Sequence, residues 1–214
     1  MDIFQTVILA FIQGLTEFLP VSSSAHLVIF PKFFDWPDQG LAFDVVLHFA
    51  SLCAVIIYYR ASIVLLTQDF FSSILTRKMQ GDSVLAWGVL LGTIPVGLAG
   101  LFFNDYVEMN LRSFEVVAYA TIFFGLALGL SDLVHRVRGI NREVIGGSDI
   151  LIVGCAQALA LIPGTSRAGI TITAALLIGI SRKLSIKFAF LLSIPVITLA
   201  TIMKLLELSN DSQQ

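Results

Sequence analysis

Two short stretches of this chain place groups capable of chemistry inside otherwise apolar segments. The first, residues 13–26, reads QGLTEFLPVSSSAH and holds a carboxylate, three consecutive hydroxyls and an imidazole. Gln13 and Glu17 lie four residues apart, so they share one face of a helix. Pro20 ends that helix and leaves the serines free to begin another. The sequence therefore predicts that carboxylate, hydroxyls and imidazole meet at a break in the backbone.

The second stretch, residues 162–171, reads IPGTSRAGIT and supplies an arginine in place of the glutamate. Aligned on Pro20 and Pro163, the two stretches read LPVSS and IPGTS, with a glutamine shortly upstream of each proline. This alignment pairs Ser23 with Ser166. We interpret the two breaks as halves of one site, related by a weak internal repeat.

Hydroxyl residues precede the helix expected after each break, and such residues are good N-caps. Exposed backbone N–H groups and the positive end of the helix dipole suit phosphate, so two converging helix N-termini suggest a diphosphate. Arg167 adds a charged fork that matches phosphate oxygens two at a time, the alternative being a structural ion pair with Glu17. Gly164 permits close backbone approach. The residues expected to bind the diphosphate are Ser22, Gly164, Thr165, Ser166 and Arg167.

Glu17 is also the candidate ligand for a divalent cation. Mg²⁺ commonly binds through one or two carboxylates plus substrate phosphates, and Ca²⁺ is the alternative ion. Gln13, one turn earlier, can supply a carbonyl ligand or a hydrogen bond but no charge, and a plain helix–helix hydrogen bond is the competing interpretation. The metal hypothesis therefore rests on Glu17 with Gln13.

His26 and Ser23 compete for the role of nucleophile. Imidazole titrates near neutral pH and forms covalent intermediates, so His26 could be either the nucleophile or a general acid/base. The sequence leaves covalent and direct-water mechanisms open. His48, in an apolar run, is expected either to line the cavity or to hydrogen-bond a neighbouring helix. His135, in a basic segment, is expected to be solvated.

Composition indicates an integral membrane protein, with the lipid bilayer as its surroundings. The 214 residues are 57% hydrophobic and 13% charged, whereas soluble domains are about 25% charged. A net charge of -2 gives no reason to expect nucleic acid as a partner. Cys53 and Cys155 lie in apolar runs and are expected to be buried, with no disulfide or zinc site. The opening MDIFQTVILAF has no basic residue, so no cleaved signal is expected.

Apolar runs divide into two kinds by length. Four are long enough, or nearly so, to cross a hydrocarbon core, which needs roughly 20 helical residues: about 42–59, 84–103, 114–134 and 186–206. Four others are interrupted by proline, glycine or polar residues and are too short to cross: 3–18, 22–31, 149–162 and 169–180. The connection near 60–83 contains LLTQDFFSSIL, which is apolar enough for an interfacial helix.

Basic residues orient these segments, because Lys and Arg in short loops are retained on the cytoplasmic side. Three connections are basic and are expected to be cytoplasmic: the first carries Arg60, Arg77 and Lys78, the second Arg136, Arg138 and Arg142, and the third Arg182, Lys183 and Lys187. The connections at 32–39 and 104–112 have one basic residue each beside Asp35, Asp38, Asp105 and Glu108, and are expected outside.

This orientation requires residues 149–180 to enter the membrane and return, and residues 3–31 to dip from the opposite face. Broken helices brought together by inverted repeats are a known way to build a midplane site. The predicted fold is an all-α polytopic membrane protein, an inverted repeat with two re-entrant helix hairpins and about four full transmembrane helices. Residues 1–214 are expected to form one integral membrane domain, with repeat one at about 1–135 and an incomplete repeat two at about 148–206.

These motifs resemble those of the undecaprenyl-diphosphate phosphatase family, also called the bacitracin-resistance protein family. QGLTEFLPVSSSAH is similar to its glutamate-rich first motif and PGTSRAGIT to its PGxSRSxxT motif; FDVVLH, GTIPVGLAGLFF and SRKLSIKFAFLLSIPV are similar to further segments. The resemblance implies a bacterial inner-membrane enzyme whose site opens to the periplasmic face. Such an enzyme removes one phosphate from C55 polyprenyl diphosphate, recycles the lipid carrier for peptidoglycan synthesis and confers bacitracin resistance. A divalent cation is implied as well.

Carried over position by position, the resemblance implies a site made of Glu17, Ser23, His26, Ser166, Arg167 and Thr171. Thr171 is expected, with the residues named above, to bind the diphosphate, and ordinary helix packing is the alternative. Gln13 stands where many members have glutamate, Ala25 where glycine is usual and Ala168 where serine is usual. Family chains usually continue through about two more spanning helices, so this chain is C-terminally short relative to the family. A fragment, a shortened variant and dependence on a partner are the alternatives.

Two other functions stay open at this point. Inverted repeats with broken helices are also a transporter architecture, which leaves a polyprenyl-phosphate flippase or transporter as an alternative. The other is an inactive remnant that binds prenyl phosphates. A homo-oligomer is also open.

Overall fold

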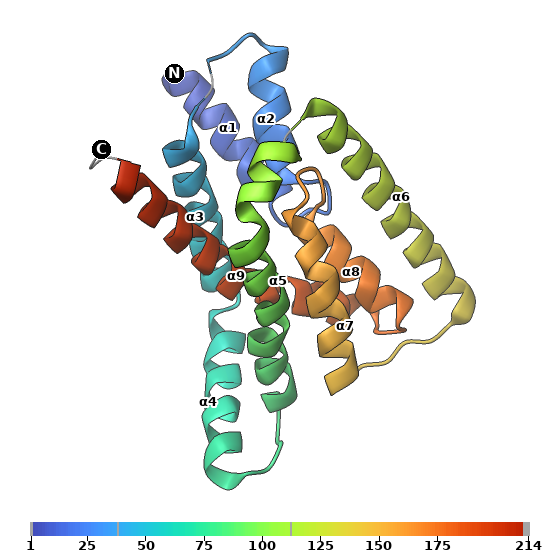
Figure 1. Ribbon diagram of the computed structural model, residues 1–214. Coiled ribbons are helices and arrows are strands. Elements are labelled where there is room, and N and C mark those ends of the chain that lie inside the picture. The colour runs from blue at the N-terminus through green and yellow to red at the C-terminus, as the bar shows by residue number, and fades with distance from the viewer. Residues whose placement is uncertain (1, 38, 112, 212–214) are drawn as a thin grey trace.

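The structure, a computed structural model, describes residues 2–37, 39–111 and 113–211. Within these ranges every regular element is helical, as the sequence predicted (Figure 1). The elements are α1 (Ile3–Thr16), α2 (Ser23–Phe33), α3 (Leu41–Tyr58), α4 (Arg60–Thr76), α5 (Ser83–Asn110), α6 (Phe114–Arg138), α7 (Gly147–Ala158), the 3-10 turn η1 (Leu159–Leu161), α8 (Arg167–Leu177) and α9 (Arg182–Asp211). Asp38 and Arg112, expected in outward-facing connections, lie outside the described residues.

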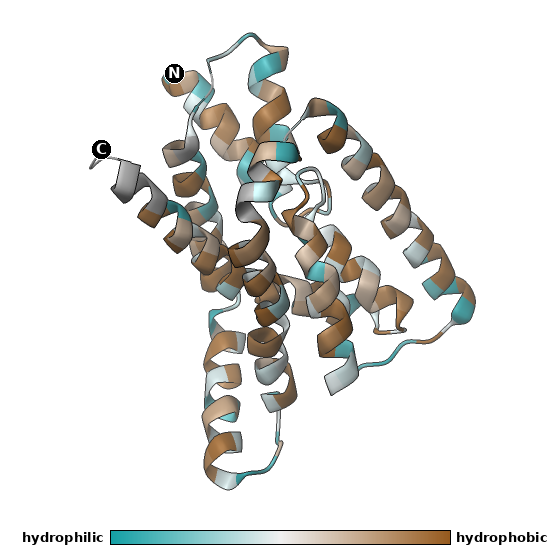
Figure 2. Ribbon diagram, viewed as in Figure 1, coloured by the Kyte–Doolittle hydropathy of each residue, from teal (hydrophilic) through white to brown (hydrophobic). Residues whose placement is uncertain are grey.

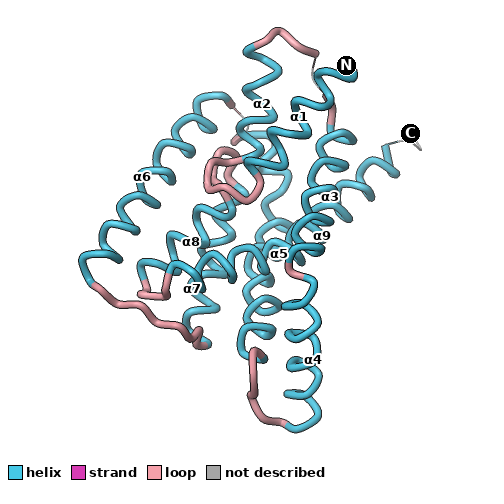
Figure 3. The backbone as a smooth tube through the Cα atoms, turned by 180° about the vertical axis from the view of Figure 1, so that it is seen from behind, coloured by secondary structure: helices cyan, strands magenta, loops and turns pink. Residues whose placement is uncertain are grey.

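Two helical hairpins frame the rest of the fold. One consists of α1 and α2, and the other of α7, η1 and α8; in each, the paired helices pack against each other. With η1 counted as the end of α7, the bounds of these helices differ from the predicted short pieces by three residues or fewer. Figure 3 shows the two loops that interrupt the hairpins lying close to each other, midway along the molecule.

A proline fixes how the first hairpin joins α3. Pro31 lies inside α2 and has no N–H, so the Leu27 carbonyl lacks its usual helical donor. The side-chain amide of Gln39 supplies one, donating to Leu27 O at 3.1 Å and to Asp44 Oδ1 at 3.0 Å. The α2–α3 connection is thereby tied to the first turn of α3.

Among the residues that the structure describes, three helices are long and apolar enough to cross a membrane: Ser83–Phe103, Phe114–Arg138 and Arg182–Leu206. These contain three of the four predicted spans. The fourth predicted span, α3, reaches the same standard only together with α4, from which it is bent by 76°. Figure 2 shows apolar residues along most of α5, α6 and α9.

The helix expected within the connection at 60–83 is present, and a second predicted connection is more helical than expected. The apolar stretch inside residues 60–83 belongs to α4, which begins directly after α3 and packs on α5. Residues 104–110 were expected in an outward-facing connection, but they continue α5 to Asn110. An unbroken run of helix-compatible residues follows the apolar run in that segment, so loss of hydropathy was a poor marker of the helix end.

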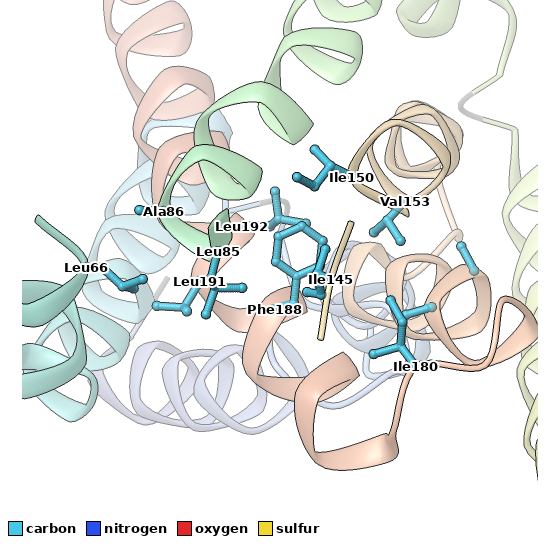
Figure 4. Packing of buried hydrophobic residues seen from close by; sticks show 12 residues of the cluster. Leu66, Leu85, Ala86, Ile145, Ile150, Val153, Ile180, Phe188, Leu191 and Leu192 are labelled. Atoms are coloured by element: carbon cyan, nitrogen blue, oxygen red, sulfur yellow. The ribbon is translucent and has the colours of Figure 1, made fainter. Parts of the chain in front are cut away.

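The largest core cluster lies between α4, α5, α7, α8 and α9. Phe188, fully buried, stands at its centre, with Ile145, Leu191 and Leu192 around it (Figure 4). On α7, Gly154 allows the closest approach in this region, because a Cβ there would lie 2.8 Å from the Gly92 carbonyl oxygen of α5. Burial of these side chains fixes α7, and hence the second break, against α5 and α9.

Helix α6 lies along one edge of the molecule and packs on α8 (Figure 1). His135 near its end is buried rather than solvated: its ring lies 3.2 Å from the Leu176 carbonyl oxygen and 3.0 Å from Asn141 Oδ1. The prediction for His135 was wrong because charge in the surrounding sequence does not reveal which helical face meets α8. Cys155 is exposed and Cys53 half-buried, so the expectation that both are buried was also wrong.

Arg142 anchors the segment between α6 and α7. Its guanidinium donates two hydrogen bonds of 2.9 Å to the Asp149 carboxylate and one of 2.8 Å to the Ile178 carbonyl. Its backbone N–H also donates to Gly179 O. This single side chain therefore joins the start of α7 to the end of α8. These hydrogen bonds hold the pKa of Asp149 below its usual value.

Candidate functional site

A cavity of about 360 Å³ lies where the two hairpin breaks meet. Much of its lining is apolar and comes from α3, α5, η1 and α9. Polar groups are concentrated on the breaks and on two facing helices: Glu17, Ser22, Ser23, Ser24, Asp44, His48, Thr165, Ser166, Arg167, Thr201 and Lys204. An apolar chamber with a few convergent polar groups is the usual form of a small-ligand site.

Glu17 is the centre of the polar network. It is 8% exposed and directly follows α1. Its Oε1 accepts a hydrogen bond from Arg167 at 2.5 Å, and its Oε2 accepts one from Ser23 Oγ at 2.6 Å and one from Gln13 Nε2 at 2.8 Å. The predicted sharing of one helical face by Gln13 and Glu17 is confirmed. Oε1 of Glu17 thus contacts the second break, and Oε2 contacts residues of the first hairpin.

Arg167 joins the second break to the first and to α9. It is the first residue of α8, and besides Glu17 its guanidinium donates to the Ser193 carbonyl of α9 at 3.2 Å. Its side chain is 14% exposed, against 6% for Glu17. Removing one member of a buried ion pair typically costs about 3–5 kcal/mol, because the other charge is left uncompensated. This pair therefore holds the two breaks together whatever else it does.

Two helix N-termini point into the cavity region, as predicted. Ser22 caps α2 by accepting from the Ala25 N–H, and Ser166 caps α8 by accepting from the Gly169 N–H. Ser22 adopts a φ of 61°, a left-handed conformation that is costly for serine. The caps are thus Ser22 and Ser166, whereas the alignment on the two prolines paired Ser23 with Ser166. The offset leaves Ser23 one residue inside α2, with its hydroxyl on Glu17.

His48, which the sequence left ambiguous, is the imidazole beside Glu17. Its Nδ1 lies 2.7 Å from the Asp44 carbonyl oxygen and its Nε2 3.6 Å from Glu17 Oε2. Because a carbonyl only accepts, Nδ1 carries a proton, and Nε2 is the nitrogen that can exchange one at the cavity. The available signal was the FDVVLH segment, which puts Asp44 and His48 four residues apart on one face of a helix.

His26 lies elsewhere. Its Nδ1 is 2.8 Å from the Ser22 carbonyl oxygen, one turn earlier in the same helix, and His26 is not among the residues that line the cavity. The imidazole that contacts Glu17 in the described structure is that of His48, whereas the His26 ring contacts a carbonyl within its own helix turn.

Gly164 and Thr171 also do not line the cavity. Gly164 has a φ of 94°, and a Cβ on it would lie 2.4 Å from the Val117 carbonyl oxygen, so packing against α6 requires glycine there. Thr171 is buried and donates within α8 to the Arg167 carbonyl at 2.9 Å. The structure gives both residues packing roles, which for Thr171 was the alternative interpretation.

Candidate ligands for a metal ion are few. The described residues contain no group of three or more His, Cys, Asp or Glu side chains placed to hold an ion. Glu17 is already paired with a guanidinium. The Oε1 atom of Gln13 is buried without a partner, but Gln13 does not line the cavity. These residues do not fit a divalent cation held by the protein alone.

Sequence reasoning missed the polar residues that α9 contributes. Thr201 and Lys204 line the cavity from the last turns of this helix. The available signal was a lysine inside an apolar span, since intramembrane charges are costly and mark functional sites. It was overlooked because Lys204 lies near the end of the predicted span.

The fold and the cavity together define a multi-pass α-helical membrane protein with a partly polar cavity at two helix breaks. Residues 6–214 match the sequence profile of the bacitracin resistance protein BacA. The chain belongs to this family.

Several relatives share this similarity over nearly the whole chain. The undecaprenyl-diphosphatase of Vesicomyosocius okutanii is 56% identical over 213 residues, covering 100% of this chain and 81% of the relative. Undecaprenyl-diphosphatase 2 of Stutzerimonas stutzeri is 54% identical over 210 residues, with 97% and 78% covered. The undecaprenyl-diphosphatase of Campylobacter concisus is 51% identical over 211 residues, with 99% and 79% covered.

Proposed function

We propose that this chain is an undecaprenyl-diphosphatase, a hydrolase that converts undecaprenyl diphosphate to the monophosphate and phosphate. The observation that carries the proposal is the Glu17–Arg167 pair, which puts a base and a phosphate-binding fork at two converging helix N-termini. The relatives with this printed name match along nearly the full chain. Recycling of the lipid carrier in peptidoglycan synthesis and bacitracin resistance follow from that activity.

Ser23 is our proposed nucleophile, in preference to His26. Its Oγ lines the cavity and donates to Glu17 Oε2 at 2.6 Å, so the carboxylate can take the hydroxyl proton as the oxygen attacks. The new bond forms between Ser23 Oγ and the terminal phosphorus, while the bond from that phosphorus to the bridging oxygen breaks. Undecaprenyl phosphate leaves with the bond electrons. Water then hydrolyses the phosphoserine and releases phosphate.

Electrostatic stabilisation is the main task of the remaining groups. The transferred phosphoryl spreads negative charge over its oxygens, and Arg167 with the backbone N–H groups that open α2 and α8 can donate to them. His48 Nε2 is placed to take a proton from the hydrolytic water or return one to the leaving phosphate. The apolar lining lowers the local dielectric and strengthens each of these interactions.

We also propose that a divalent cation, Mg²⁺ or Ca²⁺, binds together with the substrate. Since the protein residues do not hold one alone, the diphosphate itself would have to supply most of its ligands, beside Glu17. Bound in that way, the ion would neutralise phosphate charge.

The finer topology is likewise our proposal. Residues 3–33 and 147–177 form re-entrant hairpins of an inverted repeat, within one integral membrane domain in the bacterial inner membrane. The site opens to the periplasmic face. Basic residues flanking the second hairpin on both sides support this arrangement. Homo-oligomerisation stays a prediction.

Phosphate release from purified protein with undecaprenyl diphosphate in detergent tests the function. We expect release to require the protein and to be lost in Glu17→Gln. Transbilayer movement of the lipid in vesicles without phosphate release would support the flippase alternative. Binding with neither release nor movement would support the inactive remnant.

A further inference from the structure

The cavity has a second polar end that the reaction at Glu17 does not use. It is formed by Thr201 and Lys204 on α9, while Thr165 lines the cavity from the second break, two residues before Arg167. The cavity-lining residues of α9 recur at 196, 197, 200, 201 and 204, so one face of the helix is turned toward the cavity along this whole length.

Two hydroxyls among the cavity-lining residues have no partner. Thr165 is 4% exposed and Thr201 is 8% exposed, and neither Oγ1 atom makes a hydrogen bond in the described structure. Buried polar atoms are nearly always satisfied, and each exception needs an explanation. A ligand that accepts hydrogen bonds inside the cavity would explain why both hydroxyls lack a partner within the protein.

Thr201 is unusual for a threonine in a helix. Such hydroxyls commonly donate to a carbonyl one turn earlier. Thr198 on the same helix does so, donating to the Ile194 carbonyl at 2.7 Å, and Thr121 and Thr173 do the same on α6 and α8. Among the described helical threonines, Thr201 is the exception. Its donor is therefore available to the cavity.

The separation from Arg167 suits an elongated anion. Arg167 donates to the Ser193 carbonyl, and a rise of 1.5 Å per residue puts Thr201 about 12 Å further along α9. Side chains of a helix lean toward its N-terminus, so Lys204 reaches back toward Arg167. Arg167, Thr165 and the α8 N-terminus stand at one end of the cavity, and Lys204 with the Thr201 hydroxyl stands at the other.

We infer that Thr201 and Lys204 form a second phosphate subsite, with Thr165 beside the first, so that the cavity selects a diphosphate over a monophosphate. This inference rests on the proposed function and deepens it. Arg167, Ser23 and Thr165 hold the terminal phosphate that is cleaved, and Lys204 with Thr201 holds the phosphate attached to the lipid. Lys204 is then a specificity-determining residue: it takes part in binding the group that remains on the product.

The test is a binding measurement that does not depend on turnover. Calorimetry on the purified full chain compares inorganic pyrophosphate with inorganic phosphate for the parent, Lys204→Gln and Thr201→Val. We expect the parent to prefer pyrophosphate and the Lys204→Gln variant to lose about tenfold or more of that preference, with phosphate binding changed less than about twofold. Lys204→Arg should keep most of the preference.

Matched controls separate the subsite from general effects. Thr198→Val removes a hydroxyl that is bonded within α9, and Lys78→Gln removes an exposed lysine; both should bind pyrophosphate as the parent does. An unchanged pyrophosphate preference in folded Lys204→Gln and Thr201→Val would overturn the subsite. Absence of phosphate release from undecaprenyl diphosphate by the parent would overturn the proposed function instead, and the two failures are therefore distinguishable.

Discussion

Arg167 donates a hydrogen bond of 2.5 Å to Glu17 across 150 residues of sequence. Each residue stands at the interruption of its own helical hairpin, Glu17 after α1 and Arg167 at the start of α8. Packing of α7 and α8 against α5, α6 and α9 sets the position of the second partner. The contact therefore reports the correct assembly of the whole helical fold as well as the local chemistry.

Membrane topology gives the first prediction. If residues 147–177 form a re-entrant hairpin, single cysteines at Gly147 and Lys183 should label from the same side of the membrane, since both are exposed and flank the hairpin. The labelling is done in a background lacking Cys53 and Cys155, because Cys155 is itself exposed. Labelling from opposite sides would rule out the hairpin and the inverted repeat with it.

The second prediction distinguishes Ser23 from His26 as the nucleophile. Ser23→Ala should reduce turnover by on the order of 1,000-fold or more, because it removes the attacking oxygen. His26→Gln should stay within about tenfold of the parent, since His26 does not line the cavity. Phosphate release at saturating substrate measures both, with His48→Gln as the comparison imidazole. A loss in His26→Gln as large as in Ser23→Ala, at equal folded protein, would return His26 to the reaction.

The third prediction concerns Gln13 and the dependence of activity on a divalent cation. Gln13→Glu replaces the amide that donates to Glu17 Oε2 with a second carboxylate. Two adjacent carboxylates repel unless a proton or a cation lies between them. We expect activity to depend more steeply on added Mg²⁺ or Ca²⁺, with a midpoint several-fold lower than in the parent and near-complete loss in chelator. Gln13→Met, which adds no charge, is the control. The same midpoint in Gln13→Glu and the parent would mean that position 13 does not influence an ion.

Asp149 gives a prediction about stability and pH. Arg142 hydrogen bonds lower the Asp149 pKa in the folded chain. A carboxyl with a lowered folded pKa stabilises above its unfolded value, about 3.9, and that contribution is lost as pH falls through the folded pKa. Asp149→Asn should lower the Tm at pH 7 by several degrees, corresponding to about 1–3 kcal/mol.

The acid side of the Tm profile distinguishes this ion pair from simple packing. Below about pH 4 the parent should approach the variant, because protonation removes the same charge that the substitution removes. Asp69→Asn, which loses a hydrogen bond to the Asp82 N–H on the exposed side of α4, is the control carboxylate. A Tm difference between parent and Asp149→Asn that stays constant as the pH falls from 7 to about 2 would contradict the assignment.

Much of this architecture was predictable because hydropathy and helix breakers act locally. The short apolar pieces, their interruption near Pro20 and Pro163 and the capping hydroxyls are all visible in the sequence, and the hairpin helices follow them. The meeting of Glu17 with Arg167 was predictable only through the repeat. The internal alignment was off by one at the caps, since the left-handed turn at Ser22 has no counterpart in residue type.

Other features depend on which helical face meets which neighbour, and a single sequence does not give that. His48 replaces His26 beside Glu17 because α3 approaches the first break, a contact held partly by Gln39 bridging Leu27 and Asp44. His135 is buried because α8 ends against α6. Thr201 reaches the cavity because α9 crosses α3 and α5. Each is a tertiary contact between segments far apart in the chain.

The central claim is that the Glu17–Arg167 contact is part of a phosphoryl-transfer site and is more than a structural ion pair. The turnover number of Arg167→Lys tests it most directly, measured beside Arg167→Ala at equal amounts of folded protein. A planar guanidinium donates to two phosphate oxygens at fixed geometry, whereas an ammonium acts as a point charge. We predict that Arg167→Lys loses roughly 100 to 1,000-fold in turnover, nearly as much as Arg167→Ala. Turnover of Arg167→Lys within about threefold of the parent would contradict the account, since a plain counter-ion of Glu17 can be replaced by lysine.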